Sequence, residues 1–288
     1  MFRRDAVSPM ACACLLTGIA WSSPGTAAEA SPATAAEVRA DQQFTTYAYA
    51  HEFGSGIYDF NGRTLQVYTL PFSWTVREPE GRGVGWHLQL PVTLGFLDFK
   101  ASDVISSGLP DQVDSVAFVP GIQFSFKAGE HWTLLPYAQA GASVADQSEV
   151  ETSLFGAGLR AERSLPTGKF EGRFAGELIY SGVRYRGDLP NDDFVRLRNG
   201  VSLDRAIGRQ RSGRSLRLGF FSHVDVYLDP PTGPTTGIDV PRVQFESGLL
   251  LDTRPSLKIL RIPLPSVGLS YRFAGDLSGV RFVIGAPF

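Results

Sequence analysis

Residues 222–225 are the part of this sequence that comes nearest to a catalytic arrangement. They read Ser222, His223, Val224 and Asp225. Alternate side chains of an extended strand share one face, so His223 and Asp225 would lie together, with Glu246 near them on a later strand. A histidine beside a carboxylate can act as the base for a serine nucleophile, as in hydrolases of membrane lipid. A hydrolase would need the serine on a lipid-accessible face beside the histidine, and the sequence has no Gly-x-Ser-x-Gly elbow. Barrel interiors are polar by default, so an interior hydrogen-bonding pair is the preferred interpretation of His223 and Asp225.

A second set of residues that could take part in binding or catalysis is charged, and it recurs at alternate positions of several segments. The set contains both signs: Glu171, Arg173, Glu177, Arg196, Arg198, Asp204, Arg217, Asp225, Arg242 and Glu246. Unpaired buried charges are costly, so we expect these groups to pair with one another. A mixed set can line a conducting pore or close it, and it predicts no strong ion selectivity.

The sequence gives little indication of metal, cofactor or nucleic-acid binding. The four histidines (His51, His87, His131 and His223) have no metal-binding spacing, so the sequence predicts neither a metal site nor a cofactor. The 288 residues carry a formal net charge of −2, which gives no reason to expect nucleic acid as a partner.

The elements that must position these residues are long strands, and 83–96 is the clearest of them. Seven apolar residues alternate there with small or polar ones. At roughly 3.3 Å per residue and a tilt near 40°, such a strand crosses the hydrocarbon layer of a membrane.

The same alternation recurs along most of the chain. Segments that show it are 43–53, 63–77, 83–96, 116–126, 131–144, 153–163, 170–180, 195–203, 216–228, 243–251, 267–273 and 278–288. The pattern predicts an all-β fold: a transmembrane, antiparallel up-and-down β-barrel of about twelve strands over 43–288, with ten as the alternative count. The first connection is expected at 54–62. Aromatic residues are expected to form interfacial girdles: Tyr68, Trp74, Trp86, Trp132, Tyr180, Tyr271 and Phe288.

The last strand is the strongest single indication of membrane insertion. Val280, Phe282, Ile284, Ala286 and Phe288 share one face, which is wholly apolar. In a soluble protein such a strand would invite aggregation, whereas in a barrel it faces lipid and closes the sheet. We expect it to pair with 43–53 and 267–273.

The N-terminal region resembles a secretory leader. Residues 1–28 combine two early arginines, a short apolar stretch and small residues suited to cleavage, and 29–42 would be a short periplasmic lead-in. Cys12 and Cys14 are the only cysteines, so the mature chain would contain none. The expected location is the cell outer membrane.

The C-terminal third resembles the solitary outer-membrane autotransporter-like β-barrel family of Gram-negative bacteria. Segments 260–273 and 275–288 carry the resemblance, and 243–251 is similar to that family's preceding strand. The resemblance implies a translocator-type barrel without a secreted passenger. It also implies that the outer-membrane assembly machinery reads Phe288 as a signal.

These observations favour an integral outer-membrane barrel, in contact with outer-membrane lipid, with a structural or pore-like role. Two alternatives remain open. One is an outer-membrane lipid hydrolase that uses His223 and Asp225, and the other is a secreted, soluble β-sandwich.

Overall fold

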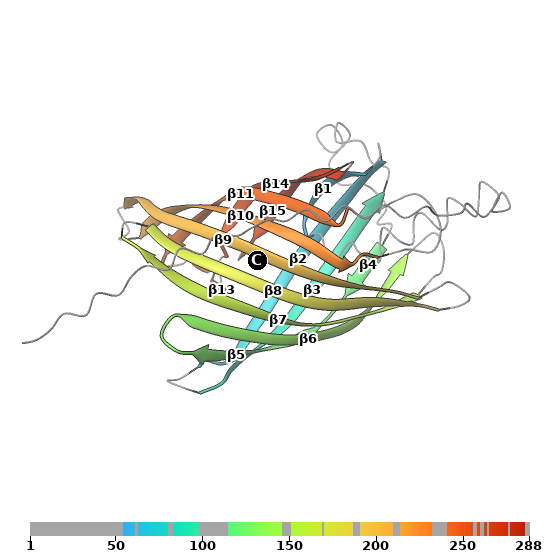
Figure 1. The fold of residues 1–288 in the computed structure, drawn as a ribbon, viewed down its shortest axis with the longest axis horizontal. Helices are drawn as coiled ribbons and strands as arrows, with labels where there is room; N and C mark the ends of the chain where they lie inside the picture. Colours follow the sequence, from blue (N-terminus) through green and yellow to red (C-terminus); the bar gives the residue numbers. More distant parts are fainter. Residues whose placement is uncertain are drawn as a thin grey trace, which may run out of the picture. The chain divides into compact units, whose positions relative to one another are not determined.

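The fold is an antiparallel sheet that closes on itself (Figure 1), described from a computed structural model. The described residues are 54–60, 63–79, 83–97, 115–145, 151–168, 170–186, 191–209, 214–231, 241–255, 258–259, 262–263, 265–275 and 277–285. All of them belong to one compact unit, Thr34–Phe288. The expected leader, lead-in and Phe288 lie outside the described residues.

The strands follow one another around the sheet in the order of the chain. They are β1 (Gly56–Phe60), β2 (Arg63–Arg77), β3 (Gly85–Leu97), β4 (Ser115–Phe118), β5 (Gly121–Ala128), β6 (Trp132–Ala145), β7 (Glu151–Thr167), β8 (Phe170–Tyr185), β9 (Asp192–Arg209), β10 (Ser215–Asp229), β11 (Val243–Arg254), β14 (Val267–Ala274) and β15 (Leu277–Ile284). β1 pairs with both β2 and β15, which closes the ring. A closed single sheet contradicts the alternative of a two-sheet sandwich.

β4 and β5 are two parts of one crossing strand. Both pair with β3 on one side and β6 on the other. Val119 and Pro120 separate them, and proline has no N–H to donate to a sheet. Thirteen elements therefore make twelve crossing strands, which confirms the predicted count. A small hairpin, β12 (Lys258–Ile259) with β13 (Ile262–Pro263), lies between β11 and β14.

The first connection is not where the sequence pattern placed it. Residues 54–62 were expected to form a loop because they are rich in glycine and polar residues, but Gly56–Phe60 is strand β1. Gly56 pairs with Arg281 of β15 and with Val67 of β2. Sheet closure by both neighbours outweighs the weak strand preference of this segment. The expected pairing of the last strand with 43–53 lies outside the described residues.

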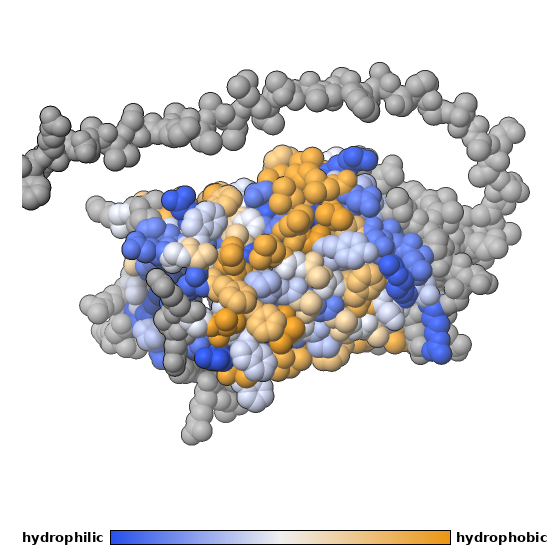
Figure 2. Space-filling model, turned by 60° about the horizontal axis from the view of Figure 1, so that its bottom comes forward, coloured by the Kyte–Doolittle hydropathy of each residue, from blue (hydrophilic) through white to orange (hydrophobic). Residues whose placement is uncertain are grey.

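The two faces of the wall differ in chemistry, as strand alternation requires. On β14, Val267, Leu269, Tyr271 and Phe273 are exposed on the outside, while Ser270 and Arg272 are buried inside. Figure 2 shows hydrophobic surface over the middle of the wall and hydrophilic surface toward its two ends. No helix among the described residues is long and apolar enough to cross a membrane.

The barrel has two ends, which we name by their connections. At the turn end, β5–β6 and β7–β8 are joined through Gly129 and Gly168, whose φ angles of 81° and 70° suit glycine. The loop end is the opposite end, where β3 and β10 end and where β4 and β11 begin.

Candidate functional site

The candidate site is a set of charged side chains inside the space that the sheet encloses, here called the lumen. The register of the sheet aligns two rows of them. One row contains Arg160, Glu177, Arg198, Asp225 and Gln244, and the next contains Gly200, His223, Glu246, Arg272 and Gly279. Opposite charges at directly paired positions of a sheet attract one another.

The first row is held by Asp225, which is buried on β10. Arg198 Nε and Nη2 donate to its two carboxylate oxygens, at 2.6 and 2.9 Å. This is a bidentate, charge-assisted pair, which fixes both side chains in direction. Arg196 Nε lies 4.0 Å from Asp225, and Arg196 Nη2 lies 3.7 Å from Glu177.

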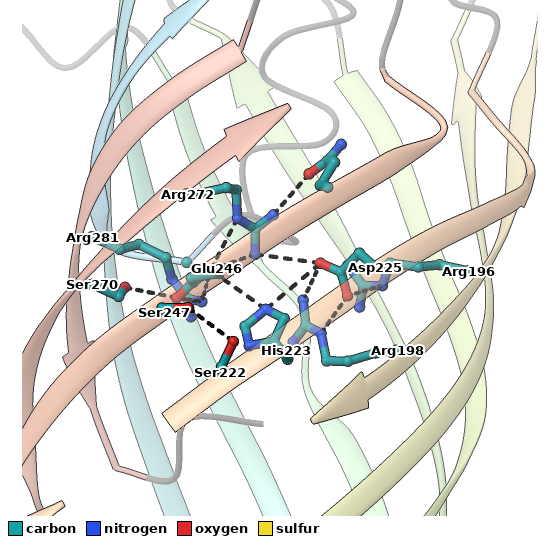
Figure 3. Close-up of polar contacts among 12 residues, drawn as sticks. Arg196, Arg198, Ser222, His223, Asp225, Glu246, Ser247, Ser270, Arg272 and Arg281 are labelled. Atoms are coloured by element: carbon teal, nitrogen blue, oxygen red, sulfur yellow. Dashed lines mark hydrogen bonds and ion pairs between the residues drawn. The ribbon is translucent and has the colours of Figure 1, made fainter. Parts of the chain in front are cut away.

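The second row is held by Glu246, whose residue exposure is 0%. Ser270 Oγ donates to Glu246 Oε1 at 2.7 Å (Figure 3). Arg272 donates through Nε and Nη2 to Oε2 at 3.0 and 2.8 Å, and Arg281 Nη1 donates to both oxygens at 2.8 and 2.9 Å. Arg272 Nη2 also lies 3.5 Å from Asp225, so it joins the two rows.

We call these eight residues the central network: Glu177, Arg196, Arg198, His223, Asp225, Glu246, Arg272 and Arg281. Arginine retains its charge under all ordinary conditions, so four guanidinium groups face three carboxylates. The network is therefore rich in positive charge and nearly dry, because most of its members are buried.

His223 contacts both carboxylates and does not form a triad with Ser222. Its Nε2 lies 3.5 Å from Glu246 and 3.8 Å from Asp225. Ser222 lies on the outer face, where its Oγ is 2.8 Å from that of Ser247 (Figure 3). The strand backbone separates Ser222 from His223, so this serine cannot serve as a nucleophile with that base.

An apolar layer lies beside the central network. His223 stacks on Phe221, with ring centroids 6.1 Å apart. Phe221 packs with Ala175 of β8, Val283 of β15 and Leu250 of β11. Between β8 and β15 lie four crossing strands in one direction around the barrel and six in the other, counting β4 and β5 as one, so this contact crosses the lumen.

The other predicted lumen charges gather at the turn end. Glu171 pairs with Arg217 at 2.9 Å and with Arg254 at 2.6 Å. Asp204 also contacts Arg217. Both residues line a pocket at this end of the barrel, and Arg173 lines it too. Arg242 joins neither set: its side chain is exposed just before β11, although its backbone carbonyl accepts a hydrogen bond from Tyr227 N of β10 at 2.8 Å.

Arg272 and Arg281 are the important members that sequence reasoning omitted. Both lie at inward positions of strands that the sequence pattern predicts at 267–273 and 278–288. The same parity rule that selected Glu246 would have selected them.

No group of three or more His, Cys, Asp or Glu residues in the described part of the chain could hold a metal ion.

The fold has counterparts among solved structures. The translocator domain of autotransporter NalP from Neisseria meningitidis matches with a TM-score of 0.54 and 11% identity, covering 86% of this chain and 94% of that one. The chain has the fold of an autotransporter translocator barrel. The beta domain of the Bordetella autotransporter BrkA matches with a TM-score of 0.50 and 13% identity, covering 80% of this chain and 96% of that one.

A third structure, LpxR from Salmonella typhimurium, has a TM-score of 0.39 at 9% identity, with 78% of this chain and 89% of that chain covered. No protein-family model and no curated protein sequence matches the chain. The likeness therefore concerns the fold.

Proposed function

We propose that the chain is an integral outer-membrane barrel of the translocator type, whose lumen is closed in the resting state. The observation that carries this proposal is the apolar outer wall of a closed barrel. Outward positions of β10 from Leu216 to Leu228 are apolar except for Ser222. At about 3.3 Å per residue and a tilt near 40°, that stretch spans roughly 30 Å, the thickness of a hydrocarbon core.

The closed lumen is the second part of the proposal. Glu246 and Phe221 are both fully buried, although they lie on the inner face of the wall. A wide aqueous pore would expose inner-face side chains to water. Cross-lumen packing and ion pairs support a barrel that acts as a stable body in the membrane.

Membrane fractionation tests the location. The chain should remain in the membrane pellet after urea or carbonate washing, because its outer wall requires lipid. Recovery in the soluble fraction after osmotic shock would reject the proposal.

Planar-bilayer recording tests the state of the lumen. The wild-type barrel should insert and conduct weakly, because the central network and the Phe221 layer obstruct the path. A large, steady conductance in the wild type would show instead that the barrel is an open pore.

We also propose that 1–28 directs export and that Phe288 is read by the assembly machinery. Both proposals come from the sequence pattern and the resemblance to outer-membrane barrels. Deletion of Phe288 should lower the amount of folded barrel in the membrane, whereas Phe288→Trp, which keeps an aromatic end, should not. Normal assembly of the deletion variant would contradict the role of Phe288.

A further inference from the structure

The lumen contains a pocket of about 210 Å³ beside the central network. One side of the pocket is charged and comes from β7, β8 and β9. The other side is polar but uncharged, and comes mainly from β3 and β6. The residues that matter for the argument are Gln89, Tyr137, Gln139, Arg160, Arg196 and Arg198.

Charge in this pocket is unbalanced. Three arginines line it, whereas Glu177 is the single carboxylate among its described lining residues. Arg198 is held by Asp225, as described above. Glu177 accepts a hydrogen bond from Tyr137 Oη at 3.0 Å, and Arg196, 3.7 Å away, offsets its charge.

Arg160 makes one long ion pair among the described residues, and Glu162, its partner, does not line the pocket. Its Nε lies 3.8 Å from Glu162, and that nitrogen makes no hydrogen bond to the described residues. The side chain is only 17% exposed, so bulk water solvates the charge poorly. A guanidinium in that position gains strongly from an oxyanion that accepts two of its N–H groups.

Gly158 helps to keep the pocket in this form. It pairs with Tyr137 across β6 and β7, and a Cβ at Gly158 would come within 2.6 Å of Tyr137 Cζ. The missing side chain lets the Tyr137 ring lie over β7 and reach Glu177 on β8. The phenol O–H thus occupies one oxygen of the Glu177 carboxylate.

We propose that this pocket, here called the Arg160 pocket, binds a small oxyanion, with phosphate or carboxylate as the recognised group. Arg160 supplies the main charge-assisted contact. Amide groups of Gln89 and Gln139 add neutral donors from the opposite side. The pocket opens into the lumen, whereas lipid would lie against the outer wall, so the ligand is a free anion rather than a lipid headgroup.

Inorganic phosphate is the probe for the test. The full-length barrel is folded in neutral detergent micelles, and binding is followed at low ionic strength by ³¹P NMR titration or calorimetry. Wild-type barrel should bind phosphate saturably. Arg160→Gln should weaken binding about tenfold or more, the usual effect of losing a charge-assisted hydrogen bond.

Arg163→Gln is the matched control. Arg163 is on the same strand, three residues away, but it lies on the outer face over the Trp132 ring. Its removal changes the net charge equally and should leave phosphate binding unchanged. Gln139→Glu is a second test variant, which keeps every arginine and should also abolish binding by adding a carboxylate.

The proposal is overturned if folded wild-type barrel shows no saturable binding, or if Arg160→Gln binds as tightly as wild type. Folding of each variant is checked by its heat-dependent gel mobility. The pocket and the membrane location are tested separately, because a barrel that fractionates with membranes but does not bind phosphate rejects only the anion site.

Discussion

Glu246→Gln is the most informative single perturbation of the central network. The change keeps the size of the side chain and one oxygen acceptor, but it removes the negative charge. Arg272 and Arg281 together donate four hydrogen bonds of 2.8–3.0 Å to this carboxylate. Arg272 is only 1% exposed, so its charge cannot be solvated by water after the change.

The expected cost follows from this geometry. Removing one partner of a buried ion pair typically costs about 3–5 kcal/mol. Asp225 lies 3.5 Å from Arg272 and compensates part of the loss, so we expect about 3 kcal/mol in the free energy of unfolding. Unfolding by urea or guanidinium in lipid vesicles, followed by tryptophan fluorescence, measures this difference.

Glu171→Gln is the control, because Glu171 also accepts from two arginines but lies at the turn end. Its side chain is 55% exposed, and exposed pairs contribute below about 1 kcal/mol. The double variant Glu246→Gln/Arg281→Gln should recover part of the lost stability by removing a surplus positive charge. Equal stability of Glu246→Gln and wild type, or equal losses in the two single variants, would refute the reasoning.

Three further predictions concern the wall, the apolar layer and Tyr137. Leu249→Arg, at a 53% exposed outward position of β11, should destabilise the barrel by about 2–4 kcal/mol in vesicles if that position lies near the bilayer midplane; unchanged unfolding would argue against a lipid-facing wall. Phe221→Ala removes the centre of the apolar layer and should cost about 3–5 kcal/mol while raising bilayer conductance; conductance equal to wild type would mean that this layer does not obstruct the lumen. Gly158→Ala should displace the Tyr137 ring and cost about 1–3 kcal/mol, whereas Tyr137→Phe, which keeps the ring, should cost less; the reverse order in denaturant unfolding would contradict the close contact.

The sequence pattern was sufficient for the strand count and for the direction of most side chains. Strands with a long apolar face, such as β10 and β14, are unambiguous because one face must avoid water. β1 was misplaced because Gly56–Phe60 has no such face and is specified by its neighbours in the sheet.

The site was predictable only as a set of inward charges. Alternation identifies the face on which Arg198 and Asp225 lie, but their pairing depends on the register between β9 and β10. Register is a property of two strands together, and bulges near Leu216 and Tyr227 shift it locally. The separation of the charges into a central network and a turn-end cluster therefore required the structure.

The closure of the sheet has a consequence for how the barrel folds. β1 and β15 pair residues from opposite ends of the barrel sequence, such as Gly56 and Arg281. All other neighbouring crossing strands are consecutive along the chain, if β4 and β5 count as one strand and the small β12–β13 hairpin is left out. Contacts distant in sequence form late, because the intervening chain must first be ordered. Glu246 and both of its arginines lie on β11, β14 and β15, so their ion pairs do not depend on β1. We expect the strands that carry the central network, β8 to β11 with β14 and β15, to assemble from local hairpins. The pairing of β15 with β1 should be the last to form and the first to separate.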